Sequence, residues 1–246
     1  MPAEKRGQAT FWLARGQWNP YNAIIMARKP RVDAGGMCYH VINRGNNRAE
    51  VFHKDQDYLR FTEMIGEATE RLPMRVLSWC LMPNHFHMVL RPRKDGDLSA
   101  WIQWLMTAHV RRYHRHYHSS GHIWQGRYKL FVIQDDHHYL AVLRYVENNA
   151  LKANLAERAE YWKWSSLYAL KRQDVFPFLV PGPVCRPRNW LSLVNKEQPQ
   201  KEVEQIRTSV IRERPLGDQG WIEKIAKKFA LEQTIRPRGR PRKTDK

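Results

Sequence analysis

Short apolar runs alternate with segments of helical periodicity in the middle of the chain. Four runs bounded by turn-forming residues are typical of strands, namely Met37–Asn43, Met74–Met82, His85–Leu90 and Tyr128–Ile133. Between and after them, apolar residues three and four positions apart predict helices. These helices cover Asp55–Arg71 with Asp55 as N-cap, Asp97–Tyr117, and a segment from Asp135 or Asp136 to about Asn149.

The predicted order of elements is β-α-β-β-α-β-α, which indicates an α+β protein. Its first six elements match the ferredoxin-like split βαβ arrangement, with a mainly antiparallel sheet and helices on one face. We expect this compact domain over residues 35–170, after an N-terminal arm at 1–34 that has no sustained period. Residues 171–235 form a proline-broken extension with short helices at Glu202–Arg214 and Gln219–Leu231, and 236–246 form a basic tail.

Charge and cysteine content narrow the choice of partner and compartment. Lys and Arg outnumber Asp and Glu by 42 to 24, and the net charge of +18 favours a polyanion. No apolar run approaches the ~18 residues of a membrane span, and no leader pattern opens the chain, so we expect no membrane partner. The odd, widely spaced cysteines predict no disulfide framework and a reducing compartment, the cytoplasm or nucleoid; they are Cys38, Cys80 and Cys185.

Two histidines flank one apolar residue in the third predicted strand. Alternate residues of a strand share a face, so His85 and His87 point the same way and Phe86 points the other. Two neutral imidazoles at that spacing could converge on one cation. Taken alone, the pair is better explained as two ordinary histidines on a half-buried strand.

Tyr145 and Asn149 lie one helical turn apart on the third predicted helix, and therefore on one face. A tyrosine hydroxyl can attack phosphorus and form a covalent phosphotyrosine, although its usual pKa near 10 requires a nearby cation or base. Asn149 could supply a neutral oxygen to a metal held by the histidines. Tyr139 is the rival nucleophile, but it faces another direction at 100° per residue.

Other basic and imidazole groups are weaker candidates. A run of histidines on the second helix is better suited to phosphate contact or to a solvated surface than to metal binding: His109, His114, His116 and His118. His137 and His138 could assist locally at the start of the tyrosine helix. In the tail, Pro237–Pro241 resembles an AT-hook, whose Arg-Gly-Arg enters a narrow minor groove. A generic phosphate-binding tail is the other interpretation.

Five ordered blocks between Met37 and about Leu167 resemble the single-tyrosine HUH transposases, and within them the REP-associated tyrosine transposases. The family's His-x-His motif is matched by His85-Phe86-His87 after Met82-Pro83-Asn84, and its nucleophile helix by Tyr145–Leu155. The other blocks are Tyr39–Arg48, His122–Tyr128 and Trp162–Leu167. Three positions depart from the family pattern: Ala150 and Asn154 affect how the helix ends, and the Glu147 side chain is expected to face away from Tyr145.

The resemblance implies an HUH nuclease domain that acts as a metal-dependent single-strand DNA endonuclease and strand transferase on hairpin DNA. Tyr145 would form a covalent 5′-phosphotyrosine, and His85, His87 and Asn149 would hold Mg²⁺ or Mn²⁺. We expect no small-molecule substrate and leave the oligomeric state open. Candidate DNA contacts are Arg44, Arg48, Arg111, Arg112, Arg115, Arg127, Arg238 and Arg240.

Two other functions fit the same charge and fold. A non-catalytic DNA- or RNA-binding protein would need the basic surface but not the histidine pair or the tyrosine. A metal hydrolase that uses water would cleave DNA without a protein–DNA adduct.

Overall fold

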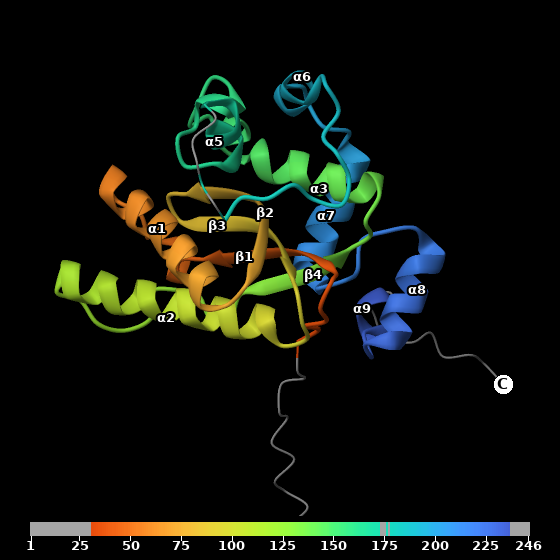
Figure 1. The fold of residues 1–246 in the computed structure, drawn as a ribbon, viewed down its shortest axis with the longest axis horizontal. Coiled ribbons are helices and arrows are strands. Elements are labelled where there is room, and N and C mark those ends of the chain that lie inside the picture. The colour runs from red at the N-terminus through yellow and green to blue at the C-terminus, as the bar shows by residue number, and fades with distance from the viewer. Residues whose placement is uncertain (1–30, 173–175, 177, 237–246) are drawn as a thin grey trace, which may run out of the picture. The chain divides into compact units, whose positions relative to one another are not determined.

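The computed structural model describes residues 31–172, 176 and 178–236. The arm expected before residue 31 and the basic tail from residue 237, with Arg238 and Arg240, lie outside these residues (grey in Figure 1). From Val32 onward the described chain forms one compact unit. Among its helices, none has both the length and the apolar character that crossing a bilayer requires.

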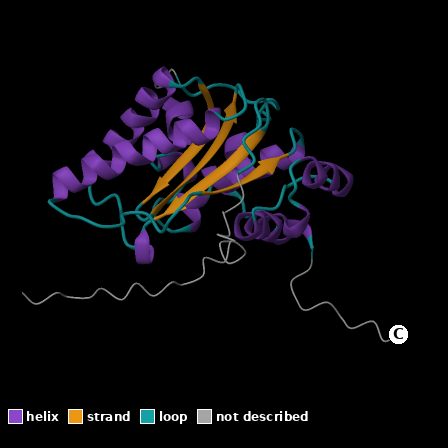
Figure 2. Ribbon diagram, turned by 90° about the horizontal axis from the view of Figure 1, so that it is seen from below, coloured by secondary structure: helices purple, strands orange, loops and turns teal. Residues whose placement is uncertain are grey.

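Four strands form one antiparallel sheet in the order β2-β3-β1-β4. The strands are β1 (Cys38–Arg44), β2 (Met74–Met82), β3 (His85–Pro92) and β4 (Lys129–Ile133). Figure 2 shows them side by side, with helices on either side of the sheet. This is the strand order of the ferredoxin-like fold, so the predicted fold class is confirmed.

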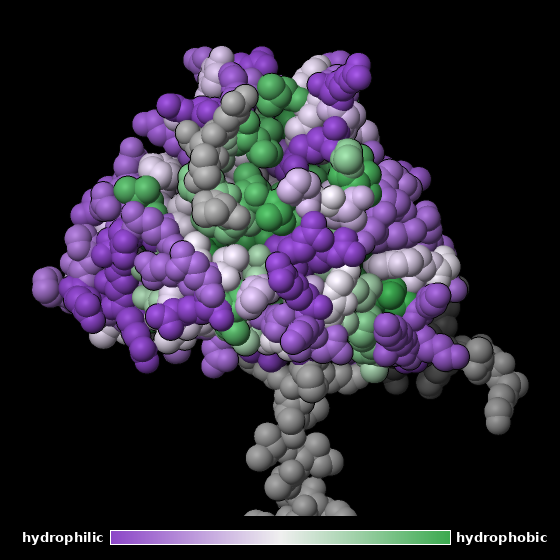
Figure 3. Space-filling model, viewed as in Figure 1, coloured by the Kyte–Doolittle hydropathy of each residue, from purple (hydrophilic) through white to green (hydrophobic). Residues whose placement is uncertain are grey.

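The helices α1 (Asp55–Arg71) and α2 (Asp97–Tyr117) cover one face of the sheet (Figure 1). Phe86 points to this face and packs against Phe61 of α1, with ring centroids 5.5 Å apart. Because side chains alternate along a strand, burying Phe86 here turns its two neighbours to the other face. On the face drawn in Figure 3, hydrophilic residues dominate the surface over α1 and α2.

The tyrosine helix lies on the opposite face of the sheet, in two pieces. α3 spans His137–Glu147, and α4 spans Asn149–Lys152. Asp136 is the N-cap of α3, as expected, and accepts a hydrogen bond from the backbone N–H of His138 at 2.8 Å. The helix predicted to about Asn149 is interrupted only at Asn148, whose backbone stays in the helical region while its side-chain amide donates to the Val194 carbonyl.

The start of α1 also differs from the prediction. Lys54, not Asp55, is the N-cap. The first backbone N–H groups are instead satisfied by the Asp57 carboxylate, which accepts from His53 at 2.9 Å and from Lys54 at 3.2 Å. A carboxylate in the first turn can complete the cap in this way.

The segment after β4 and α3 packs back onto the sheet through several short helices. They are α5 (Ser166–Arg172), α6 (Trp190–Asn195), α7 (Gln200–Arg212), α8 (Gln219–Lys228) and α9 (Glu232–Ile235), with 3-10 turns at Ala159–Tyr161 and earlier at Asn46–Arg48. Leu216 bridges to Ile133 of β4. Cys38 and Cys80 are buried, and Cys185 is exposed.

Candidate active site

His85 and His87 project from β3 toward the face that α3 covers. Their ring centroids are 5.0 Å apart, and the ring planes lie at 81° to each other. His87 is 2% exposed and pairs in register with Cys80 of β2 and Ile42 of β1. The strand period therefore places both imidazoles beside each other at the centre of the sheet.

Each ring is held through its Nδ1 atom. His85 Nδ1 donates to Asn84 Oδ1 at 2.6 Å, and His87 Nδ1 lies 2.9 Å from Nε2 of the buried His40. Burial lowers the pKa of His85 to about 4 and holds the pKa of His87 well below its usual value, with Arg44 lowering both. Both imidazoles are therefore neutral at pH 7 and present Nε2, the form in which histidine binds metal.

Tyr145 and Asn149 come from the tyrosine helix to the same place. The Tyr145 ring lies 5.7 Å from the His87 ring, centroid to centroid, at 85°. The Asn149 amide nitrogen donates to the Tyr145 carbonyl at 2.7 Å, so the break at Asn148 does not separate the two residues. Because this bond engages the amide nitrogen, Oδ1 is the remaining polar atom of the Asn149 side chain. Burial raises the pKa of Tyr145, while Arg207 and Arg44 oppose this rise.

Tyr139, the rival nucleophile, has a different environment. It is fully buried in the core between the sheet and the later helices, and its hydroxyl has no hydrogen-bond partner among the described residues. Burial raises its pKa far above 10. Tyr139 does not line the cavity described next.

A cavity of about 690 Å³ opens over these side chains. It contains all four residues predicted for the catalytic and metal site, together with four cationic side chains and a short apolar wall. The lining residues are Ile42, Asn43, Arg44, His85, His87, Gln125, Arg127, Lys129, Tyr145, Asn149, Arg207, Val210 and Ile211.

The predicted arginines are divided among several parts of the molecule. Arg44 and Arg127 line the cavity. Arg48 is exposed in the 3-10 turn after β1, whereas the three arginines of α2 lie in the helix layer on the other side of the sheet. Of these, Arg111 and Arg115 are exposed, and Arg112 lines a small crevice between α1 and α2.

The histidines that the sequence analysis treated as weaker candidates take part in packing and helix capping. His109 is buried among aromatic rings, with Trp124 at 5.3 Å between centroids, and His118 ends α2 with a left-handed backbone. His138 donates to Asp136 Oδ1, the N-cap of α3, at 2.9 Å. The ligand atoms of Asp136, His137 and His138 lie within 4.8 Å of one another, but this group is accounted for by helix capping.

Sequence reasoning missed several residues of the site. His40, Gln125 and Lys129 lie on or next to predicted strands. The face to which each side chain points could be inferred from the sequence, but the order of the strands in the sheet could not. Arg207, Val210 and Ile211 come from α7, far along the chain. No local pattern connects residue 207 to residue 145, so no sequence signal identified it.

The arrangement suits a divalent cation. Two neutral imidazole nitrogens and one amide oxygen converge on a cavity rich in positive charge, and such a neutral, incomplete donor set leaves positions for phosphate oxygens. The donor set differs from that of structural zinc, which is usually closed by four Cys or His ligands.

Comparisons with known proteins show what the chain is similar to. Residues 34–149 match the family described as "Transposase IS200 like". A curated relative from Haemophilus influenzae, named as a REP-associated tyrosine transposase, is 26% identical over 133 residues, which cover 49% of this chain and 75% of the relative.

Two solved structures are also similar. One, described as a REP-associated tyrosine transposase bound to a REP hairpin, is 17% identical with a TM-score of 0.47, covering 70% of this chain and 98% of that one. Another, described as a transposase from Deinococcus radiodurans, is 19% identical with a TM-score of 0.36, covering 49% and 96%. Residues 34–149 therefore match the IS200-like transposase family, and the resemblance of the chain to the REP-associated tyrosine transposases is confirmed.

Proposed function

We propose that this protein is a metal-dependent single-strand DNA endonuclease and strand transferase that uses Tyr145 as its nucleophile. One observation carries the proposal: Tyr145, His85, His87 and Asn149 line a single basic cavity. A nucleophile, three metal donors and cations for phosphate are the parts that a transesterification on DNA requires. The family match and the named relative support the DNA-processing role, and the residue roles are inferred from this geometry.

In the proposed reaction, the Tyr145 oxygen attacks the phosphorus of a DNA phosphodiester. A bond forms between that oxygen and phosphorus, and the bond from phosphorus to the 3′ oxygen breaks. The tyrosine loses its proton and the departing strand gains one, so the products are a 5′-phosphotyrosine and a free 3′ hydroxyl. Attack by another 3′ hydroxyl reverses the step and joins strands.

The side chains around Tyr145 have separate tasks. Arg44 and Arg127 would bind phosphates on either side of the broken bond, since guanidinium groups hold phosphate through paired hydrogen bonds. His85, His87 and Asn149 would hold Mg²⁺ or Mn²⁺, which when bound polarises the phosphate and stabilises the departing oxygen. His40 and Asn84 fix the two imidazole rings through Nδ1.

A hairpin next to a single-stranded segment is the proposed substrate. The family match and the name of the Haemophilus influenzae relative, a REP-associated tyrosine transposase, support this choice. The net charge of +18 supports binding to a long polyanion. The protein would act on cellular DNA in the cytoplasm, at the nucleoid. REP-element mobilisation, a form of DNA transposition, is the proposed outcome.

Covalent trapping tests the proposal directly. Wild-type protein is incubated with Mn²⁺ and a panel of hairpin oligonucleotides labelled at the 3′ end, because the fragment that stays on the protein carries the original 3′ end. We expect a labelled protein band on a denaturing gel that Tyr145→Phe does not form. Tyr139→Phe, which removes a buried hydroxyl outside the cavity, should still form it.

Each alternative function gives a different result. Cleavage by the wild type without a protein band would indicate a hydrolase that uses water. Tight hairpin binding with no cleavage across the panel would indicate a non-catalytic DNA-binding protein. An adduct that persists in Tyr145→Phe would assign the attack to another residue.

A further inference from the structure

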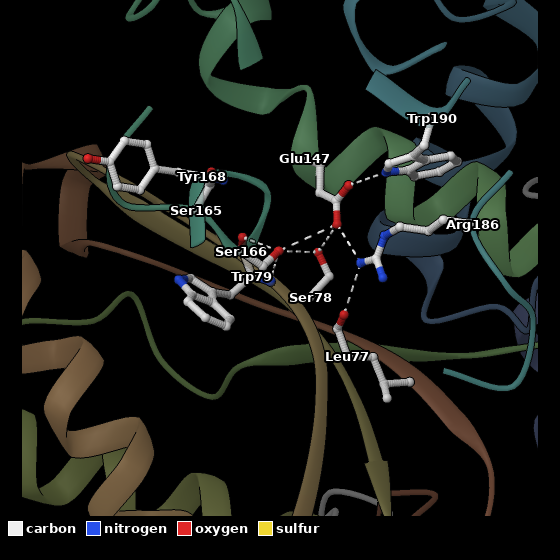
Figure 4. A network of polar contacts seen from close by, with 9 residues as sticks. All are labelled: Leu77, Ser78, Trp79, Glu147, Ser165, Ser166, Tyr168, Arg186 and Trp190. Carbon is white, nitrogen blue, oxygen red and sulfur yellow. Dashed lines mark hydrogen bonds and ion pairs between the residues drawn. The ribbon is translucent and has the colours of Figure 1, made fainter. Parts of the chain in front are cut away.

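The segment after α5 is bonded directly to the tyrosine helix. Glu147, two residues after Tyr145, is fully buried, and its carboxylate accepts from Arg186 Nη2 and from Trp190 Nε1, both at 2.7 Å. Ser78 Oγ of β2 donates to the same carboxylate at 3.1 Å. Figure 4 shows Trp190 meeting one oxygen of Glu147, while Arg186 and Ser78 both meet the other. Side chains from the later segment and from the sheet therefore bind the same buried carboxylate.

Further bonds continue this attachment along α3. Arg144 Nη2 donates to the carbonyls of Lys196 at 3.1 Å and Glu197 at 2.9 Å. One turn earlier, Gln198 Nε2 donates to the Ala141 carbonyl at 3.0 Å. The chain thus follows α3 from its end back toward its start, and α7 begins immediately afterwards at Gln200.

Packing sets the rotation of α7 about its axis. Val203, Ile206 and Ser209, spaced three apart, are buried on the face of α7 that contacts the rest of the fold. Arg207 and Val210 follow two of these buried positions by one residue and line the cavity. Arg207 thus lines the same cavity as Tyr145, and while burial raises the pKa of the Tyr145 hydroxyl, the charge of Arg207 opposes that rise.

We propose that Arg207 is a catalytic residue, and that α7 completes a site which residues 34–149 leave unfinished. Its guanidinium would hold the Tyr145 oxygen and a non-bridging oxygen of the attacked phosphate at the same time. The planar fork of arginine has enough donors for both atoms. This inference rests on the proposed function of Tyr145.

The physical role follows from where charge develops. As the bond from the tyrosine oxygen to phosphorus forms, negative charge spreads over the phosphate oxygens. A fixed cation at that point stabilises the transition state more than the ground state. Arg44 is the other cation that acts on Tyr145, but it projects from β1 within the family-matched segment. Arg207 projects from α7, outside residues 34–149.

The test compares single-turnover rates of adduct formation in full-length protein with saturating 3′-labelled hairpin and Mn²⁺. We expect Arg207→Gln to slow adduct formation about 100-fold or more, with hairpin affinity changed less than ten-fold. Arg207→Lys should restore part of the rate by returning the charge. Arg212→Gln is the matched control, because it removes the same charge from the same helix outside the cavity lining, and it should react like wild type.

Chemical rescue separates catalysis from a structural role. Millimolar guanidinium, far below denaturing concentrations, should accelerate Arg207→Ala and leave Arg212→Ala unchanged. An Arg207→Gln rate equal to that of wild type, or a loss shared equally by Arg212→Gln, would overturn the assignment of Arg207 and leave that of Tyr145 standing. Absence of an adduct in wild type would overturn both. A thermal melt of each variant confirms folding, and if Arg207→Gln is unfolded, Arg207→Lys and the rescued Arg207→Ala decide the question.

Discussion

At the residue scale, a third histidine determines how His87 can act. Burial lowers the pKa of His40 to about 3, so it is neutral, and its Nε2 lies 2.9 Å from His87 Nδ1. One of these nitrogens must donate the proton. A metal-binding His87 needs a free lone pair on Nε2, so its Nδ1 must be the donor and His40 Nε2 the acceptor. His40 thereby selects the tautomer of His87.

Replacing His40 should therefore weaken metal binding without touching a ligand. We expect His40→Leu to lower the affinity for Mn²⁺ about ten-fold or more, measured by calorimetric titration of the protein without DNA. His109→Leu is the control, since it removes another buried, neutral imidazole on the opposite face of the sheet. Equal Mn²⁺ affinity in His40→Leu and wild type would show that His40 does not set the tautomer.

At the element scale, the tyrosine helix is held by a buried ion pair. Glu147 was noted in the sequence only as a departure from the family pattern, and its side chain was expected to point away from Tyr145. It does so, and it meets Arg186, which is 19% exposed. Attraction to Glu147 raises the pKa of Arg186 despite its burial. Breaking such a pair leaves an uncompensated buried charge.

Glu147→Gln should thus destabilise the fold markedly, although the amide has nearly the same shape. We expect a loss of about 3 kcal/mol in the free energy of unfolding, measured by urea denaturation. Glu63→Gln, which breaks an exposed pair with Arg60 on α1, should change it by less than about 1 kcal/mol. Equal losses of unfolding free energy in the two variants would show that the buried ion pair does not hold this helix in place.

Long elements were predictable from sequence, but short ones were not. The helices α1 and α2 have the predicted bounds, because periodicity over many residues outweighs local ambiguity. The seven-residue α5 and the six-residue α6 were missed. Helices of that length are stable only through tertiary contacts, such as the bond from Trp190 of α6 to Glu147.

At the scale of the whole molecule, several buried neutral histidines make stability depend on pH. The pKa is lowered by burial to about 3 in His40 and to about 4 in His85 and His109, against 6.5 in the unfolded chain. Between those values the unfolded state binds protons that the folded state does not. Their contribution to the free energy of unfolding is therefore full above pH 6.5 and is lost as pH falls toward 4.

His109 allows this dependence to be tested away from the cavity. Its ring packs among Phe52, Phe61 and Trp124, so His109→Phe keeps an aromatic side chain there. Between pH 7 and pH 4.5, wild type should lose about 2 kcal/mol more in the free energy of unfolding than the variant, measured by urea denaturation at each pH. Parallel losses would show that His109 titrates normally in the folded protein.

The sequence by itself determined what depends on neighbours along the chain. The strand period placed His85 and His87 on the face opposite Phe86, and helical spacing kept Asn149 one turn from Tyr145, because backbone geometry fixes these relations locally. Only the tertiary structure decided that His40 supports His87 and that Arg207 lines the same cavity as Tyr145. Those contacts arise where two sheet neighbours and a distant helix pack together, and such packing depends on the whole core and on no local pattern.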